Sequence, residues 1–127
     1  MLLKKSELID NQQIQITGSK SISNRLLILG KLFGNIDMLN LSNSQDTTLL
    51  KKALESDSEI MDIRHAGTAM RFLTSYYSIF EGRKTILTGS DRMKNRPIKP
   101  LVEALQSLGA DITYLEKEGF PPLQIIG

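Results

Sequence analysis

Two cations lie close together in residues 18–25, which read Gly-Ser-Lys-Ser-Ile-Ser-Asn-Arg. Alternating apolar residues precede this stretch at 12–17, and the dense apolar run 26–29 follows it. This order predicts a strand, a glycine turn and a helix start, which places Lys20 and Arg25 beside main-chain N–H groups without partners. Such groups, at the positive end of a helix dipole, favour an anionic ligand. The stretch therefore predicts an anion-binding site, although it matches neither the Walker motif nor the dinucleotide-binding motif.

Basic residues also follow two later segments that are expected to be strands. Ala66-Gly67-Thr68 turns into a helix that carries Arg71, and residues 92–96 read Arg-Met-Lys-Asn-Arg. Because residues between a strand and a helix gather at one edge of a sheet-and-helix layer, we expect these cations to converge. Arginine binds phosphate and carboxylate groups bidentately and lysine acts as a point charge, so this edge suits a small anionic ligand.

Each candidate also has an ordinary structural explanation. Cations near loops are common, so Lys20, Arg25 and residues 92–96 are also explained as solvated surface charges. The remaining candidates have structural alternatives: a turn and helix cap at Gly67-Thr68, a salt bridge at Arg71, a helix cap at Asp46 and a hydrogen-bonded structural histidine at His65. The candidates carry weight as a group because their order along the chain is regular.

The elements that must position these residues alternate along the chain, which predicts a mixed α/β (α+β) fold. Strands are expected at residues 12–17, 36–39, 60–63, 85–88, 112–115 and 123–126. Helices are expected at 23–33, from the cap Asp46 to about residue 54, from 68 to Gly82, and from Pro97 to Gly109. Apolar residues nearly surround the first helix, so we expect it to be deeply buried.

The order of elements repeats. Residues 60–126 give strand-helix-strand-helix-strand-strand, and residues 12–54 give strand-helix-strand-helix without the closing strand pair. This predicts two copies of one βαβαββ unit, the first of them shortened.

Composition limits the classes of protein that fit. The 127 residues suit one domain, and 40% hydrophobic with 24% charged residues is typical of a soluble globular protein. A net charge of +2 gives no argument for a nucleic-acid partner. Cysteine is absent, which excludes thiolate chemistry, and the single histidine cannot build a metal site by itself, so no metal is expected. No other cofactor is expected. The sequence contains no secretory signal or membrane-spanning run, so we expect a cytoplasmic protein without a membrane partner.

Three segments together resemble the 5-enolpyruvylshikimate-3-phosphate (EPSP) synthase family: Gly-Ser-Lys-Ser-x-Ser-Asn-Arg at 18–25, Ala-Gly-Thr-Ala-Met-Arg at 66–71, and Leu-Thr-Gly-x-x-Arg-Met-x-x-Arg-Pro-Ile at 87–98. The resemblance implies part of a two-domain inverse α/β barrel built of βαβαββ units. Residues 1–16 would be a strand segment of the family's other domain, and residues 17–127 a partial domain. The implied activity is transfer of the enolpyruvyl group of phosphoenolpyruvate to the 5-hydroxyl of shikimate 3-phosphate, with release of phosphate, in aromatic amino-acid biosynthesis.

The resemblance also implies which residues bind the substrates. The positions that match the family's substrate-binding motifs are Lys20, Ser21, Arg25, Gly67 and Arg96. Lys20 would lie between the two anions, and Gly67 and Arg96 on the phosphoenolpyruvate side. Secondary candidates are Asp46, His65, Thr68 and Arg71. This chain departs from the family at His65, where asparagine is usual, and at Phe72, where proline is usual.

Members of this family are several times longer, and the residues that move protons in them match nothing before Gly127. We therefore expect a fragment that is inactive alone, that requires the missing C-terminal part of the enzyme, and that associates with itself. Two alternatives stay open. One is a non-catalytic anion-binding or assembly module. The other is a relative of the UDP-N-acetylglucosamine enolpyruvyl transferase, although that enzyme commonly uses a cysteine, which this chain lacks.

Overall fold

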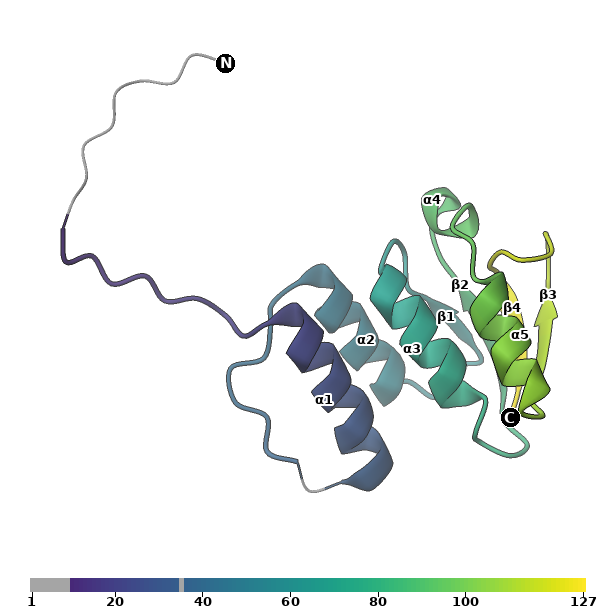
Figure 1. Cartoon of the computed structure of the whole chain (residues 1–127). Helices are drawn as coiled ribbons and strands as arrows, with labels where there is room; N and C mark the ends of the chain where they lie inside the picture. The colour runs from purple at the N-terminus through teal and green to yellow at the C-terminus, as the bar shows by residue number, and fades with distance from the viewer. Residues whose placement is uncertain (1–9, 35) are drawn as a thin grey trace, which may run out of the picture.

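A four-stranded sheet and a layer of helices make up the computed structural model, which describes residues 10–34 and 36–127 (Figure 1). The helices are α1 (Lys20–Phe33), α2 (Gln45–Glu55), α3 (Gly67–Tyr77), α4 (Asp91–Lys94) and α5 (Lys99–Ser107). The strands are β1 (Ile60–Asp62), β2 (Lys84–Thr88), β3 (Asp111–Tyr114) and β4 (Leu123–Ile126). The mixed α/β class expected from the sequence is confirmed. None of the helices in this described part has the length and apolar composition needed to cross a membrane.

The strands are ordered β1-β2-β4-β3 in the sheet. β1 and β2 run parallel and are joined by the crossover helix α3, whereas β4 is antiparallel to both β2 and β3. Side chains alternate along β2, so Thr85 and Leu87 are buried while Lys84 is exposed. Leu87 belongs to one core together with Leu73 of α3 and Val102 of α5, the two helices that lie against the sheet (Figure 1). The unit predicted at residues 60–126 is therefore complete.

Serine side chains begin three of the helices. Ser19, Ser44 and Ser90 each accept a hydrogen bond from the main-chain N–H three residues later. The cap of α2 is thus Ser44, and the prediction of Asp46 as the cap is wrong. Asp46 lies in the first turn instead, where its charge complements the helix dipole. Because Ser19 is the cap of α1, that helix begins at Lys20 rather than at residue 23.

The bounds of the later helices also differ from those predicted. α3 stops at Tyr77, short of Gly82, because the following residues form a turn in which N–H groups bond to carbonyls three residues back. The basic loop at 89–96 contains the short helix α4. Pro100, rather than Pro97, occupies the first turn of α5.

Two predicted strands are wrong. Residues 12–17 and 36–39 form no strand, because no strand of the described sheet pairs with them. Ile14 and Ile16 are accordingly 82% and 75% exposed. The unit expected at residues 12–54 is thereby reduced to the helix pair α1–α2 in the described part of the chain. The assignment of residues 1–16 to another domain stays a prediction, and residues 1–9 lie outside the described residues.

Helix α1 is less buried than its composition predicts. One flank of the helix contacts α2 and α3, and there Ser23, Asn24 and Leu27 are buried. Leu29 and Phe33 are 42% and 75% exposed. The expected deep burial is wrong because helices cover α1 on one flank alone within the described structure.

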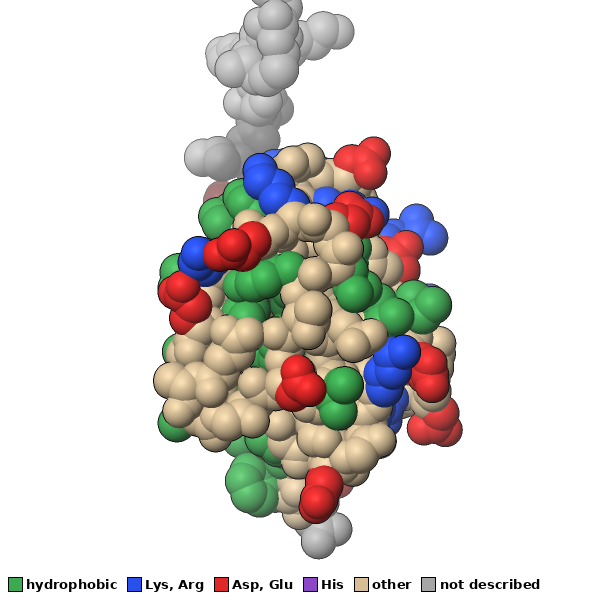
Figure 2. All heavy atoms as spheres, turned by 90° about the vertical axis from the view of Figure 1, so that its right-hand side faces the viewer, with side chains coloured by type: hydrophobic (Ala, Val, Ile, Leu, Met, Phe, Trp, Pro, Cys, Tyr) green, Lys and Arg blue, Asp and Glu red, His purple; other side chains and the backbone are tan. Residues whose placement is uncertain are grey.

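The side of the molecule formed by α5 and β3 is a mixed surface. Figure 2 faces this side and shows charged side chains of both signs scattered among hydrophobic ones. Lys94 pairs with Glu116 at 2.6 Å and Lys99 with Glu118 at 2.5 Å. In the same loop, the carbonyl of Gly119 accepts a hydrogen bond of 2.9 Å from the N–H of Ile98. These contacts attach the loop after β3 to α4 and to the start of α5.

Candidate anion-binding site

The N-terminal ends of three helices meet at one polar pocket of about 390 Å³, a volume suited to a small ligand. Lys20 is the first residue of α1, Asp46 the second of α2 and Gly67 the first of α3. The full lining is Lys20, Asp46, His65, Gly67, Thr68, Arg71, Phe72 and Arg96. The structure thus brings together the residues singled out from the sequence, with the exceptions of Ser21 and Arg25.

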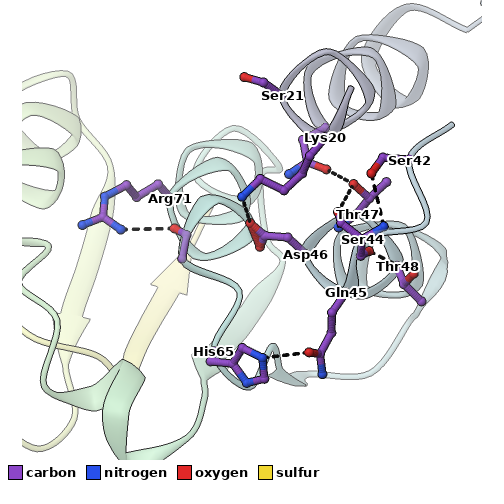
Figure 3. Close-up of polar contacts among 12 residues, drawn as sticks. Lys20, Ser21, Ser42, Ser44, Gln45, Asp46, Thr47, Thr48, His65 and Arg71 are labelled. Atoms are coloured by element: carbon purple, nitrogen blue, oxygen red, sulfur yellow. Dashed lines mark hydrogen bonds and ion pairs between the residues drawn. The ribbon is translucent and has the colours of Figure 1, made fainter. Parts of the chain in front are cut away.

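Lys20 and Asp46 form the α1–α2 side of the pocket. Figure 3 shows the Lys20 side chain reaching toward the Asp46 carboxylate, and Nζ lies 3.6 Å from Oδ1. The Lys20 side chain is 51% exposed and that of Asp46 only 11%. The second carboxylate oxygen, Oδ2, is buried and accepts no hydrogen bond from the described residues. Lys20 is therefore directed into the pocket by a carboxylate yet keeps access to a ligand.

Two buried polar contacts set the positions of the starts of α1 and α2. The Thr47 hydroxyl donates to Asn24 Oδ1 at 2.7 Å, and the N–H of Ser42 donates to the Ser23 hydroxyl oxygen at 2.9 Å. Because such contacts are directional, they fix the relative placement of the two helix starts that carry the Lys20–Asp46 pair. None of these four contact residues was predicted from the sequence to position the site. Asn24 offered a signal, since it is a polar residue that lies one helical turn before the apolar positions Leu27 and Ile28.

Gly67 and two arginines form the opposite side. A Cβ at Gly67 would lie 2.8 Å from Arg96 Cζ, so the missing side chain makes room for the Arg96 guanidinium. Arg71 donates to the carbonyl of Gly67 at 3.1 Å and to that of Pro97 at 3.0 Å. The sequence-based alternative of a salt bridge at Arg71 is therefore replaced by hydrogen bonds to two main-chain carbonyls. No side chain caps the start of α3, which leaves its first N–H groups available to an anion.

His65 and Thr68 complete the lining next to Gly67. His65 lies in the loop between β1 and α3, and its Nε2 is 2.8 Å from Oε1 of Gln45 on α2 (Figure 3). This contact joins the start of α2 to the loop, as expected of a structural histidine. Thr68 is the second residue of α3 and is partly buried.

Ser21 and Arg25 lie outside the pocket. Arg25 Nη1 donates to the carbonyl oxygen of Ser21 at 2.9 Å and to its hydroxyl oxygen at 2.5 Å. The Arg25 guanidinium also lies 5.8 Å from the centroid of the Phe72 ring, within the range of a cation–π contact. Phe72 lines the polar pocket on one side and an apolar groove between α1 and α3 on the other, and Arg25 lines that groove.

The charges of the pocket favour binding of an anion. Three cations, Lys20, Arg71 and Arg96, line it together with one carboxylate, Asp46. Guanidinium groups and main-chain N–H groups at a helix start bind phosphate and carboxylate oxygens. Among residues 10–34 and 36–127, no group of three or more His, Cys, Asp or Glu side chains is placed to hold a metal ion.

Comparison with known sequences identifies relatives. The model of the family EPSP synthase (3-phosphoshikimate 1-carboxyvinyltransferase) matches residues 49–127. Curated proteins named 3-phosphoshikimate 1-carboxyvinyltransferase include one from Bacteroides fragilis, 55% identical over 115 residues, and one from Photobacterium profundum, 37% identical over 144 residues. These matches cover 90% and 92% of this chain but 28% and 33% of the relatives. The chain therefore spans about a third or less of the length of these relatives.

Comparison with solved structures identifies the fold. An EPSP synthase of Acinetobacter baumannii superposes with a TM-score of 0.74 at 20% sequence identity, covering 90% of this chain and 31% of that structure. The inverse α/β fold expected from the resemblance is thereby confirmed. Because the family model matches residues 49–127, which are more than half of the chain, the chain belongs to the EPSP synthase (3-phosphoshikimate 1-carboxyvinyltransferase) family.

Proposed function

We propose that this chain contributes an anion-binding wall to an enzyme that transfers the enolpyruvyl group of phosphoenolpyruvate to the 5-hydroxyl of shikimate 3-phosphate and releases phosphate. The observation that carries the proposal is the convergence of Lys20, Arg71 and Arg96 on one pocket beside the uncapped start of α3. Both substrates carry a phosphate ester and a carboxylate. A pocket with three cations and free N–H groups matches that chemistry.

The residues divide the binding between the two substrates. Lys20 lies between the two anions, Ser21 and Arg25 contact shikimate 3-phosphate, and Gly67 and Arg96 contact phosphoenolpyruvate. The remaining lining residues that the sequence singled out are Asp46, His65, Thr68 and Arg71. To contact the substrate, the Arg25 guanidinium must give up its hydrogen bonds to Ser21 and its contact with the Phe72 ring. A charge-assisted bond to the phosphate compensates for the loss of these contacts.

In the reaction, the 5-hydroxyl oxygen loses its proton and forms a bond to C2 of phosphoenolpyruvate, while the methylene carbon gains a proton. The methylene carbon then loses a proton as the C–O bond to phosphate breaks, and the proton from the hydroxyl leaves with the released phosphate. The cations of this pocket stabilise the negative charge on the phosphate and carboxylate groups. The groups that move the protons lie in a further part of the enzyme, so the 127 residues bind substrate without turning it over. Lys20, Arg96 and a main-chain N–H at the start of α3 can each form a charge-assisted bond of about 1.5–3 kcal/mol, which together supply roughly 5–9 kcal/mol before ordering costs. Micromolar binding requires about 8 kcal/mol, so weak binding is expected.

Titration of the 127-residue chain with phosphoenolpyruvate and with shikimate 3-phosphate, followed by NMR, tests the proposal. Lys20→Ala should weaken the binding of both substrates, and Arg96→Ala that of phosphoenolpyruvate, each at least about tenfold, because each substitution removes a charged donor. Lys52→Ala is the matched control, since Lys52 is an exposed lysine on α2 that does not line the pocket. Binding that survives both site substitutions would contradict the proposed site.

A turnover assay separates the enzyme from a non-catalytic anion-binding module. We expect no turnover by the 127 residues alone. Adding the part of the Bacteroides fragilis relative that lies beyond the matched region should restore it. Turnover by the chain alone would contradict the proposal that the proton-moving groups lie in a further part of the enzyme. Substrate binding without restored turnover would favour the non-catalytic anion-binding module.

The partner that we propose besides the substrates is the further part of the same enzyme. In its absence, we propose that copies of the chain associate through the apolar groove between α1 and α3, which has a volume of about 400 Å³. Exposed apolar surface of this kind commonly marks an interaction site. The cytoplasmic location expected from the sequence stays a prediction.

A further inference from the structure

Arg71 joins two segments that are far apart in the sequence. Its Nη1 donates to the Gly67 carbonyl at 3.1 Å and its Nη2 to the Pro97 carbonyl at 3.0 Å. The first carbonyl belongs to the opening residue of α3, and the second lies between α4 and α5. A planar guanidinium presents its donors in a fixed fork, so these two carbonyls are held at a set separation.

The segment bound in this way carries Arg96, which directly precedes Pro97. The N–H of Arg96 donates to the Met93 carbonyl at 2.9 Å, and the N–H of Ile98 to the Gly119 carbonyl at 2.9 Å. Pro97 itself has no N–H to donate. In the described part of the chain, the bond from Arg71 is therefore the hydrogen bond that attaches residues 96–97 to α3.

The side chains of the two arginines differ in what they contact. Arg71 is partly buried, and both of its terminal nitrogens are directed at carbonyls. Arg96 is exposed, packs against Gly67 and forms no hydrogen bond or ion pair through its side chain with the described residues. Arg96 is thus placed to meet an anion, whereas Arg71 is placed to hold the main chain on both sides of it.

We propose that Arg71 is a positioning residue, which acts on an anionic ligand through Arg96 rather than by touching the ligand. By holding the carbonyls of Gly67 and Pro97 together, it sets the Arg96 guanidinium over Gly67 at the uncapped start of α3. The proposal rests on the proposed function for its ligand, and it differs from the secondary substrate-binding role implied by the resemblance.

A double-mutant cycle tests this indirect action. Arg71→Lys keeps the charge but loses the fork, so phosphoenolpyruvate binding should weaken about fivefold in the parent chain. In the Arg96→Ala background, the same substitution should change the affinity by less than about twofold, because the group that it positions is gone. Equal losses in both backgrounds would overturn the proposal, since they would mean that Arg71 meets the ligand itself.

A measurement without ligand keeps this test separate from the proposed function. The NMR order parameter of the Arg96 Nε–H bond should fall in Arg71→Lys, and also in Arg71→Met, which retains an unbranched apolar stem and no donors. An unchanged order parameter would overturn the proposal whether or not phosphoenolpyruvate binds. If the parent chain did not bind phosphoenolpyruvate but the order parameter still fell in the variants, the proposed function would be rejected. The positioning role of Arg71 would then be retained.

Arg83→Lys is the matched control. Arg83 also donates to a main-chain carbonyl, that of Ser56 at 3.2 Å, and it lies over the Tyr77 ring, away from the pocket. Its substitution removes a similar structural bond but should leave both the affinity and the Arg96 order parameter unchanged. A change equal to that of Arg71→Lys would assign the effect to general loss of stability and overturn the proposal.

Discussion

Gly67 lines the pocket at a point where little room is left for a side chain. A Cβ there would lie 2.8 Å from Arg96 Cζ and 3.1 Å from its Nη2. We predict that Gly67→Ala displaces the Arg96 guanidinium and weakens phosphoenolpyruvate binding about tenfold or more, the loss expected for a charge-assisted bond. The fold should be retained, because the obstructed group is the end of a flexible side chain. NMR titration measures the affinity, and thermal unfolding followed by circular dichroism measures the stability.

Gly82→Ala provides the contrast. Gly82 has a φ of +75° in the turn after α3, and nothing lies within 4 Å of a Cβ built there. Alanine in this left-handed conformation should cost about 1–2 kcal/mol of stability without affecting the affinity. If Gly67→Ala bound phosphoenolpyruvate as tightly as the parent, the steric role of Gly67 would be wrong.

At the scale of single residues, the sequence motifs predicted the location of the site well. They predicted the contacts of each side chain less well. Lys20, Gly67 and Arg96 converge on one pocket as the sequence predicts, although the strand expected before Lys20 is absent from the described sheet. Arg25 does not, because acceptors on Ser21 lie one helical turn away and satisfy its guanidinium. Such competition between a nearby partner and a distant site depends on the folded geometry, so sequence spacing alone does not reveal it.

At the scale of elements, prediction succeeded where a segment completes its own hydrogen bonds or has a pairing strand within the described sheet. The helix α2 and the strands β1 to β4 were all predicted within a few residues of their bounds, and α3 was predicted at its start. The strands predicted at 12–17 and 36–39 failed, since an alternating pattern indicates a strand only if another strand pairs with it. The burial predicted for α1 failed in a similar way, since apolar residues are buried only where another element packs on them. The exposed apolar residues of α1 mark a helix surface on which no element packs in the described structure.

The start of α5 is attached to the loop after β3 by the ion pair between Lys99 and Glu118, 2.5 Å apart. The hydrogen bond and charge of Lys99 lower the pKa of Glu118 below its ordinary value of 4.5. A carboxyl whose pKa is depressed by folding contributes stability above its unfolded pKa and loses it as the pH falls through the folded pKa. We predict that Glu118→Gln is slightly less stable than the parent at pH 7, and that the difference disappears once the pH is below the folded pKa. Urea unfolding at several pH values measures this.

Glu55→Gln is the matched control for that prediction, because it removes the longer, 3.8 Å pair with Lys51 on the surface of α2. Exposed pairs of this type contribute little, so its effect at pH 7 should be smaller than that of Glu118→Gln. Adding salt should reduce both effects, since both pairs are exposed to solvent. A Glu118→Gln difference that persists at low pH would assign the contribution of Glu118 to packing rather than to charge.

At the scale of the whole molecule, the apolar surface is unevenly distributed. The face in Figure 2 mixes charges of both signs with hydrophobic side chains. The groove between α1 and α3 instead has an almost wholly apolar lining, and Leu29, Leu32 and Ile79 in it are 42%, 38% and 63% exposed. Monomeric proteins rarely leave a large contiguous apolar patch in water. The groove is therefore the surface through which we expect copies of the chain to associate.

Sedimentation velocity over a series of concentrations tests this expectation. The 127-residue chain should form dimers or larger species as the concentration rises, because association removes the apolar groove from water. Leu32→Lys places a charge at the groove and should shift the chain to the monomer. Leu108→Lys is the control, since Leu108 is 85% exposed at the end of α5 and does not line the groove. A parent chain that stays monomeric at every concentration, or equal effects of the two substitutions, would contradict association through this groove.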